Sequence, residues 1–309
     1  MKNFKLSFLS SSIAFLALTA LTLFSAEVEA KKPIKIGFSM ALTGGLAGGG
    51  KQALVSMEMW ANDVNAKGGL LGRPVKLIYY DDQTNSKTVP GIYAKLLDVD
   101  KVDFVVSGYG TNLIAPAMPV VIQRDMVFMG LFGMNNNKKW KYDKYFQIMP
   151  SGPDPGVGFS KSWFDTVMSM RPKPKTIAFV AADAEFAKNL KEGAVTNAKR
   201  LGLKIVYNKN FKPGTPDFTP IIRAVNATKP DLFYVACYPP GSAGMTRAIS
   251  EVGTKTKAFG GGMVGLQFSG IMKGLGPKLN GVLNYDFYVP EPNMKVYPGV
   301  RDLLKRYRK

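Results

Sequence analysis

The sequence predicts an α/β protein in which two doubly wound parallel sheets form two lobes joined by a hinge. Two observations lead to this fold class. Short apolar runs alternate with helical stretches along most of the chain, and such alternation is typical of parallel sheets covered by helices on both faces. A Pro/Gly cluster at 151–156 separates two such series. A chain of 309 residues with 46% apolar content can also bury more than one core.

The first β-α-β unit is the best defined part of the sequence. The apolar run Ile34 to Met40 has the length of a buried strand, and the glycine loop Gly44 to Gly50 breaks it. Apolar residues at three- and four-residue intervals predict a helix across 53–64, and the next strand, 74–80, ends in Asp81-Asp82. The right-handed crossover makes the two strands parallel, so the glycine loop lies at the carboxyl edge of the sheet, where such folds bind ligands.

The remaining elements follow in two series. In the first series we expect helices at 86–98 and 113–124 and strands at 102–107, 126–132 and 145–150. In the second series we expect helices at 157–170, 184–201, 217–227 and 242–252 and strands at 176–181, 204–207, 231–236, 257–261 and 282–288. We therefore assign residues 31–150 to lobe 1 and residues 151–290 to lobe 2. The hinge is predicted at Ser151, Gly152 and Asp154, within the Pro/Gly cluster.

The two ends of the chain carry their own signals. Residues 1–30 are predicted to be a signal peptide, because a basic start and a long apolar centre precede Val28-Glu29-Ala30, which fits a small-residue cleavage rule. An uncleaved anchor is the alternative, since spanning a membrane takes about 20 apolar residues. Residues 291–309 are expected to begin a segment that returns to lobe 1. No closing strand follows, so the C-terminal part is expected to be truncated.

Composition limits the function classes. The sequence has no histidine, which removes the usual catalytic base and the commonest metal ligand, and no metal or cofactor site is predicted. The single cysteine, Cys237, allows no internal disulfide, and no cysteine follows the signal peptide to carry a lipid. The 41 basic residues outnumber the 22 acidic ones and are spread along the chain. We expect attraction of anionic ligands, rather than nucleic-acid binding, from this charge.

The glycine loop, the segment Asn-Ala-Lys-Gly-Gly-Leu-Leu-Gly at 65–72 and the following Asp81-Asp82 resemble the first lobe of one family. This family comprises the leucine/isoleucine/valine-type periplasmic binding proteins, which are extracytoplasmic receptors of ABC importers. The resemblance extends from about Lys32 to the end of the chain. It implies a type I periplasmic binding fold, a periplasmic location, a monomer that closes around a small ligand, and an ABC permease of the inner membrane as partner.

The same resemblance suggests where the ligand binds. It implies that the first lobe grips a ligand carboxylate through Thr111, Phe132 and Met134, although Thr111 could equally serve only to cap its helix. Family members that bind amino acids place acidic residues at the positions of Gly152 and Met263, and neither residue is acidic here. Burial of an ammonium group without a carboxylate partner costs several kcal/mol.

Aromatic residues complete the predicted site. Phe186 and Tyr238 match aromatic positions of the family's cleft, and Tyr109 and Phe132 follow first-lobe strands. The predicted ligand is therefore a hydrophobic or aromatic organic acid. The alternative ligand is a branched-chain or other hydrophobic amino acid, with Asp154 as the acidic partner if the register is shifted.

Two further classes remain open at this point. The loop Gly45 to Lys51 fits G-x-x-x-x-G-K of a phosphate-binding loop, but Gln52 stands where the motif needs Ser or Thr for magnesium. A nucleotide-binding enzyme is thus a weaker alternative, and Cys237 is better explained as a packed residue than as a nucleophile. A non-functional truncated product is the other alternative.

Overall fold

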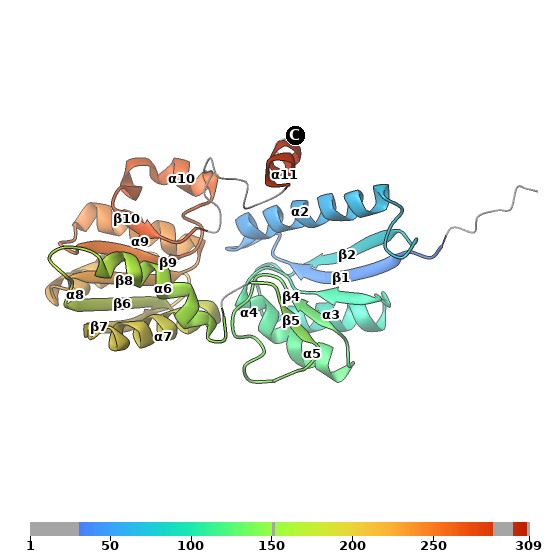
Figure 1. Ribbon diagram of the computed structural model, residues 1–309, viewed down its shortest axis with the longest axis horizontal. Coiled ribbons are helices and arrows are strands. Elements are labelled where there is room, and N and C mark those ends of the chain that lie inside the picture. The colour runs from blue at the N-terminus through green and yellow to red at the C-terminus, as the bar shows by residue number, and fades with distance from the viewer. Residues whose placement is uncertain (1–30, 150–151, 287–298, 308–309) are drawn as a thin grey trace, which may run out of the picture.

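The computed structural model describes residues 31–149, 152–286 and 299–307, and it contains two five-stranded parallel sheets in two lobes that lie side by side (Figure 1). The strand order is β2-β1-β3-β4-β5 in the first lobe and β10-β9-β8-β6-β7 in the second. Helices cover both faces of each sheet (Figure 1). The predicted fold class is confirmed.

The first lobe contains all elements before the hinge. They are β1 (Ile34–Met40), α2 (Ala47–Ala66), β2 (Val75–Asp81), α3 (Val89–Asp98), β3 (Phe104–Val106), α4 (Thr111–Ile114), a 3₁₀ turn (Ala115–Ala117), α5 (Met118–Gln123), β4 (Phe128–Gly130) and β5 (Tyr145–Gln147). β1 occupies the predicted residues, and it pairs with β2 along seven residues and with β3 on its other side. The carboxyl ends of β1, β3 and β4 therefore meet at one edge.

The second lobe contains the elements after the hinge. They are α6 (Pro155–Met168), β6 (Thr176–Ala182), α7 (Glu185–Arg200), β7 (Lys204–Phe211), α8 (Thr219–Ala227), β8 (Leu232–Cys237), α9 (Pro239–Val252), β9 (Ala258–Met263), α10 (Ser269–Leu275), a second 3₁₀ turn (Gly276–Leu279) and β10 (Val282–Asn284). Every residue of β8 and β9 is buried, which explains why β8 appears in the sequence as a continuous apolar run.

The structure departs from the predicted elements in a few places. The helix predicted at 113–124 is broken into α4, a 3₁₀ turn and α5, because Pro116 and Pro119 each lack the N–H that a continuous helix needs. β7 runs to Phe211 rather than 207, since it is an edge strand whose outer residues are polar. α10 was not predicted. The strand expected at 282–288 ends at Asn284, and residues 285 and 286 are not part of it. Residues 287 and 288 lie outside the described part.

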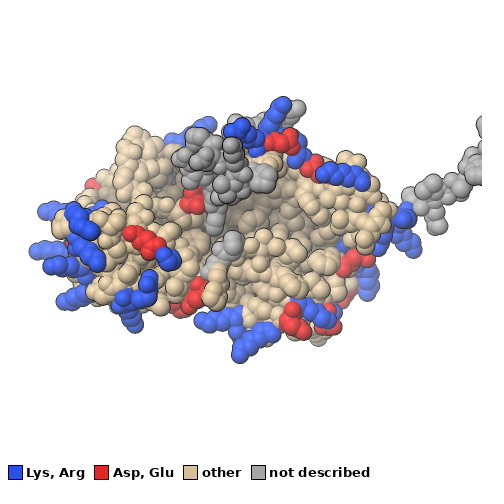
Figure 2. Space-filling view, in the orientation of Figure 1, with Lys and Arg blue, Asp and Glu red and all other residues tan. Residues whose placement is uncertain are grey.

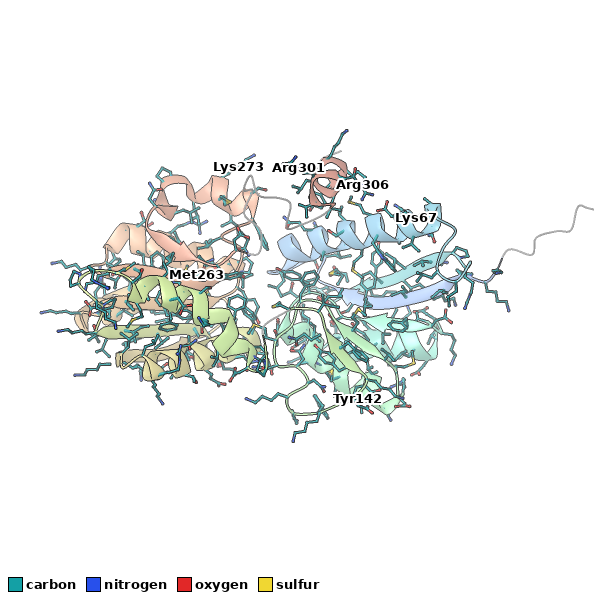
Figure 3. The ribbon with its side chains drawn as sticks, viewed as in Figure 1. Lys67, Tyr142, Met263, Lys273, Arg301 and Arg306 are labelled. Atoms are coloured by element: carbon teal, nitrogen blue, oxygen red, sulfur yellow. The ribbon has the colours of Figure 1, made fainter. Side chains whose placement is uncertain are left out.

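The predicted ends and hinge are described in part. Residues 1–30 and Ser151 lie outside the described residues, as do residues 291–298 of the predicted return segment. α11 (Val300–Tyr307) lies beside α2 of the first lobe, where Arg306 forms a 2.5 Å ion pair with Asp63 (Figure 3). The described part of the return segment therefore contacts the first lobe, and the lobe boundaries themselves stay predictions.

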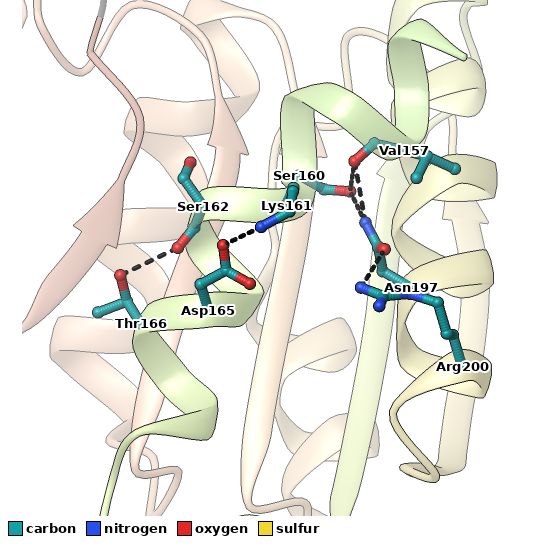
Figure 4. Close-up of polar contacts among 8 residues, drawn as sticks. All are labelled: Val157, Ser160, Lys161, Ser162, Asp165, Thr166, Asn197 and Arg200. Atoms are coloured by element: carbon teal, nitrogen blue, oxygen red, sulfur yellow. Dashed lines mark hydrogen bonds and ion pairs between the residues drawn. The ribbon is translucent and has the colours of Figure 1, made fainter. Parts of the chain in front are cut away.

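Two glycines allow α6 and α7 of the second lobe to pack closely. A Cβ atom on Gly193 of α7 would lie 2.0 Å from the backbone carbon of Gly156 in α6. Because the two helices lie so close, the Asn197 side-chain amide of α7 reaches α6. It donates to the Val157 carbonyl at 2.9 Å and to the Ser160 hydroxyl at 3.0 Å (Figure 4). Backbone approach and side-chain hydrogen bonds thus both depend on glycine at this helix crossing.

We predict that Gly193→Ala destabilises the protein by about 1–3 kcal/mol, because the added methyl group overpacks the α6–α7 contact. The measurement is the urea dependence of unfolding. Gly91→Ala in α3 is the matched control, since a Cβ atom there meets no other atom within 4 Å. This control should be neutral or stabilising by up to about 1 kcal/mol. Equal stabilities for the two variants would contradict the role of Gly193.

Candidate functional site

The carboxyl edges of the two sheets face each other and enclose two neighbouring chambers between the lobes. Residues that follow the strands of the first sheet form the first-lobe wall. Residues at or after the carboxyl ends of the second-sheet strands, with Phe159 of α6, form the opposite wall. In the view of Figure 2, basic side chains are spread over the outer parts of both lobes and along the lower edge near the point where the lobes meet. This position is the one at which open α/β sheets bind ligands.

The first chamber, here called the aromatic chamber, has a volume of about 60 Å³. Its walls come from both lobes and are formed by Tyr109, Gly110, Phe132, Met149, Phe159, Phe186, Tyr238, Val264 and Tyr285. The ring centroids of Tyr109 and Phe132 lie 5.2 Å apart on the first-lobe side, and those of Phe159 and Tyr285 lie 4.6 Å apart on the second-lobe side. The chamber is therefore a cage of aromatic rings.

The second chamber, here called the glycine-loop chamber, is larger, with a volume of about 450 Å³. The first lobe contributes Gly45, Leu46, Thr84 and Asn112. The second lobe contributes Ala182, Ala184, Phe211, Pro213, Gly214, Thr215, Phe218, Cys237, Tyr238, Pro240 and Gly241. Tyr238 lines both chambers, and its hydroxyl donates to Asn112 Oδ1 across the lobes at 3.1 Å. This hydrogen bond lies between the two chambers.

The glycine loop is held in place by the carboxylate of Asp81. This carboxylate accepts hydrogen bonds from the Leu42 and Thr43 amides at 3.0 and 3.2 Å, and from the Thr43 hydroxyl at 2.7 Å. Desolvation alone would raise the pKa of Asp81, but the hydrogen bonds from Thr43, Gln83 and Leu42 outweigh it and hold the pKa below its ordinary value. Asp81 is therefore an ionised structural anchor of the loop.

Asp82, its neighbour, lies in a different environment. The side chain is fully buried, and one carboxylate oxygen accepts from the Thr84 amide at 2.9 Å while the other has no hydrogen-bond partner among the described residues. Desolvation raises the pKa of Asp82 to about 6. The acidic pair thus has a structural role, and neither carboxylate lines a chamber.

Four of the predicted site residues meet in the aromatic chamber. Tyr109, Phe132, Phe186 and Tyr238 all line it, although they are separated by up to 129 positions in the chain. The second half of the predicted glycine loop is helical, since α2 begins at Ala47, and Tyr109 packs on this first turn: a Cβ atom on Gly49 would lie 2.3 Å from its ring. The close approach explains why glycine occupies this position of the loop.

The other three predicted ligand residues lie behind the chamber walls. Thr111, Met134 and Met263 are fully buried and line neither chamber. The Thr111 hydroxyl accepts the Met134 N–H at 3.0 Å, so these two residues fix the loop after β4. Met263 ends β9 inside the second lobe (Figure 3), where the Asn284 side chain binds its backbone N–H and carbonyl. Its backbone position predicted a wall residue, but its side chain packs into the core of that lobe.

The described hinge residues are also away from both chambers. Gly152 has a positive φ of 73°, which favours glycine at this point of the predicted hinge. Asp154 caps α6, because its carboxylate accepts the Val157 N–H at 3.2 Å. The capping role leaves Asp154 outside both chamber walls.

Several wall residues were missed in the sequence. Phe159, Tyr285, Asn112 and Phe218 were not singled out. A usable signal existed for Asn112, which directly follows Thr111, and for Tyr285, which directly follows β10. Phe159 is the fifth residue of α6, and only the packed fold shows that this turn of the helix faces the first lobe.

The geometry of the loop differs from that of a phosphate-binding loop. Such loops cradle a phosphate with several backbone N–H groups. Here the Leu46 N–H donates to Thr84 Oγ1 at 3.2 Å, and those of Ala47, Gly49 and Gly50 donate to backbone carbonyls. Glycine in this loop serves close packing instead.

Cys237 has the surroundings of a packed residue. Its side chain is fully buried, with the sulfur 3.3 Å from the Ser242 hydroxyl. Burial raises the pKa of the Cys237 thiol to about 12, so the thiol stays protonated at neutral pH. Among the described residues no group of His, Cys, Asp and Glu has a metal-binding arrangement. Within the same residues no helix has the length and apolar character that a membrane crossing requires.

Fold and geometry together define a two-lobed α/β protein with two chambers between the lobes. A family model described as "Periplasmic binding protein" matches residues 33–309, and the chain belongs to this family. It is similar to the Leu/Ile/Val-binding protein of Citrobacter freundii, with 23% identity over 230 residues, which are 74% of this chain and 61% of that protein. The chain spans about three fifths of the length of the curated relatives it matches first.

Solved structures show the same fold. The branched-chain amino acid transporter substrate-binding protein LivJ of Streptococcus pneumoniae, in complex with isoleucine, has a TM-score of 0.76 at 18% identity and covers 90% of this chain and 77% of its own. A solute-binding protein of Rhodopseudomonas palustris BisB5, in complex with 3,4-dihydroxybenzoic acid, has a TM-score of 0.63 at 18% identity over 75% and 62% of the two chains. A fatty acid transporter substrate-binding protein of Thermomonospora curvata has a TM-score of 0.71 at 19% identity over 90% and 70%.

We predict that Asp82→Asn removes a pH-dependent loss of stability. Because the pKa of folded Asp82 is raised to about 6 from 3.8, folding favours its protonated form, and this contribution is present below pH 4 and lost as pH rises through 6. The loss amounts to at most about 3 kcal/mol between pH 4 and 7.5. Urea unfolding at several pH values should show a flatter profile for Asp82→Asn than for wild type.

Asp81→Asn is the matched control for this experiment. The pKa of Asp81 is lowered, so its contribution is present throughout pH 4.5–7.5 and is lost only at lower pH. This variant should be destabilised by a similar amount at each pH in that window. Parallel profiles for wild type and Asp82→Asn would contradict the assignment of the raised pKa.

Proposed function

We propose that this protein is the periplasmic receptor of an ABC importer of the branched-chain amino acid type, and that it captures a small hydrophobic or aromatic carboxylate between its lobes. The lobes close by movement about the hinge at 151–154 and present the closed form to a permease in the inner membrane. Membership of the periplasmic binding protein family supports the receptor class. The chemistry of the two chambers supports the ligand class.

The observation that carries the ligand class is the absence of charge from the chamber walls. Among the described residues that line the two chambers, none is acidic or basic. An amino acid brings an ammonium group that needs a carboxylate partner, and burial without one costs several kcal/mol. A carboxylic acid brings only the negative charge, which neutral donors can bind and which the excess of basic residues attracts.

Tyr109 is the donor that we assign to the ligand carboxylate. Its hydroxyl has no hydrogen-bond partner within the described part of the chain, and burial raises the pKa of Tyr109 to about 12, so the hydroxyl keeps its proton. Thr111 acts indirectly in this proposal, because its hydroxyl accepts the Met134 N–H and so fixes the loop after β4 that carries Phe132.

The alternative ligand is a branched-chain or other hydrophobic amino acid. Curated relatives are named for leucine, isoleucine and valine, and the Streptococcus pneumoniae neighbour holds isoleucine. One acidic residue favours the amino acid alternative. Glu185 is exposed at the start of α7, and its negative charge, together with burial, raises the pKa of the wall residue Tyr238. A bound ammonium group would then be matched by Glu185.

We predict that 3-phenylpropanoate binds more tightly than phenylalanine, from which it differs only by the amino group. Isothermal titration calorimetry on the mature chain measures both dissociation constants. The affinity for the acid should stay constant from pH 6 to 8, because no group that titrates in this range lines the chambers. Tighter binding of phenylalanine, lost in Glu185→Gln, would favour the amino acid alternative.

We predict that Tyr109→Phe weakens the binding of carboxylates about 10- to 100-fold, because a hydrogen bond to a charged group contributes about 1.5–3 kcal/mol. Tyr142→Phe is the matched control. It removes the Tyr142 hydroxyl, which donates to the Met126 carbonyl. Tyr142 lies in the first lobe and lines neither chamber (Figure 3). An unchanged dissociation constant for Tyr109→Phe would exclude Tyr109 as the carboxylate donor.

A further inference from the structure

The sizes of the two chambers set the shape of the ligand. A cavity of about 150 Å³ is needed to hold one benzene ring, and one water molecule occupies about 30 Å³ of liquid. The aromatic chamber, at about 60 Å³, has room for a group no larger than a carboxylate. The glycine-loop chamber, at about 450 Å³, lies in the range of small-molecule sites, which is roughly 300–1,000 Å³.

The glycine-loop chamber is largely apolar, because most of its polar side-chain atoms, apart from the Asn112 amide nitrogen, are engaged with the protein. Thr84 Oγ1 donates to the Thr43 carbonyl at 2.7 Å, and Thr215 Oγ1 donates to the Lys212 carbonyl at 2.7 Å. Asn112 Oδ1 accepts from Tyr238. The rest of the wall is formed by aliphatic, aromatic, proline and glycine residues, with the buried thiol of Cys237.

The two chambers adjoin at one shared wall residue. Tyr238 contributes to the walls of both, and its hydroxyl donates to Asn112 Oδ1 of the other lobe at 3.1 Å. A molecule that extends from one chamber into the other passes this pair of side chains. Rotation of Tyr238 breaks this hydrogen bond between neutral groups and moves its ring away from that of Phe186, whose centroid lies 5.9 Å away.

We propose that the glycine-loop chamber is a second subsite that binds the uncharged, apolar tail of an elongated carboxylic acid whose head group lies in the aromatic chamber. The inference rests on the proposed function and narrows it, because it selects acids with a chain of several carbon atoms over short ones. Tyr238 and Asn112 form the gate between the two subsites. Affinity then rises with chain length until the chamber is filled.

Gly45 offers a way to fill this chamber from the first lobe. A Cβ atom on Gly45 would meet only Pro240, at an ordinary contact distance of 3.6 Å, and its φ is not positive, so a larger side chain brings no backbone strain. Gly45 lines the glycine-loop chamber and not the aromatic chamber. Gly45→Leu therefore blocks the tail subsite and leaves the head subsite unchanged.

The experiment is a calorimetric titration of straight-chain acids, butanoate, hexanoate, octanoate and decanoate, into wild type, Gly45→Leu and Gly91→Leu. For wild type we expect the affinity to rise about fourfold per added methylene group over part of the series. Gly45→Leu should lose this dependence, and its affinity should fall most for octanoate and decanoate, whose chains fill the chamber that the new side chain occupies. Gly91→Leu, on the exposed face of α3, should behave as wild type.

The outcomes separate this inference from the function on which it rests. Equal affinities across the acid series, with no effect of Gly45→Leu, would overturn the tail subsite and leave the carboxylate receptor standing. If no acid binds, the proposed function fails, and the primary alcohols of the same chain lengths then test the chamber alone. A dependence on alcohol length that Gly45→Leu abolishes supports the subsite, and its absence overturns it.

Discussion

The site depends on the carboxylate of Asp81, which ties the loop after β1 to the loop after β2. By accepting the Leu42 and Thr43 amides it fixes the start of the glycine loop, and Thr84 extends the same contact to the Leu46 amide. The loop then supplies Gly45 to one chamber wall and leads into the first turn of α2, on which Tyr109 of the other chamber packs. One ionised group, placed at the carboxyl edge of the first sheet, thus positions parts of both chambers.

The sequence was informative where local chemistry decides the structure. Parallel strands buried on both faces are apolar throughout, so β1, β6 and β8 could be located to within one residue at either end. The break of the predicted helix into α4 and α5 was readable in principle from Pro116 and Pro119. Edge strands such as β7 carry polar residues, and their length depends on pairing that no local pattern reveals.

The site was predictable in part, for a physical reason. Position after a strand places a residue at the ligand edge, and Tyr109, Phe132, Phe186 and Tyr238 meet there. This position along the chain does not fix the direction in which the side chain points. Met263 follows the same logic along the chain, yet its side chain packs into the core of the second lobe. Phe159, in α6, becomes a wall residue only in the packed fold.

The central claim is that an uncharged cleft selects acids without an amino group, and a matched pair of ligands tests it most directly. 4-Methylpentanoate is leucine without its amino group, so their dissociation constants, measured by calorimetry on the same preparation, isolate the ammonium group. The account predicts tighter binding of 4-methylpentanoate, because the described walls of both chambers carry no carboxylate. Tighter binding of leucine would contradict it and would identify this member of the family as an amino acid receptor.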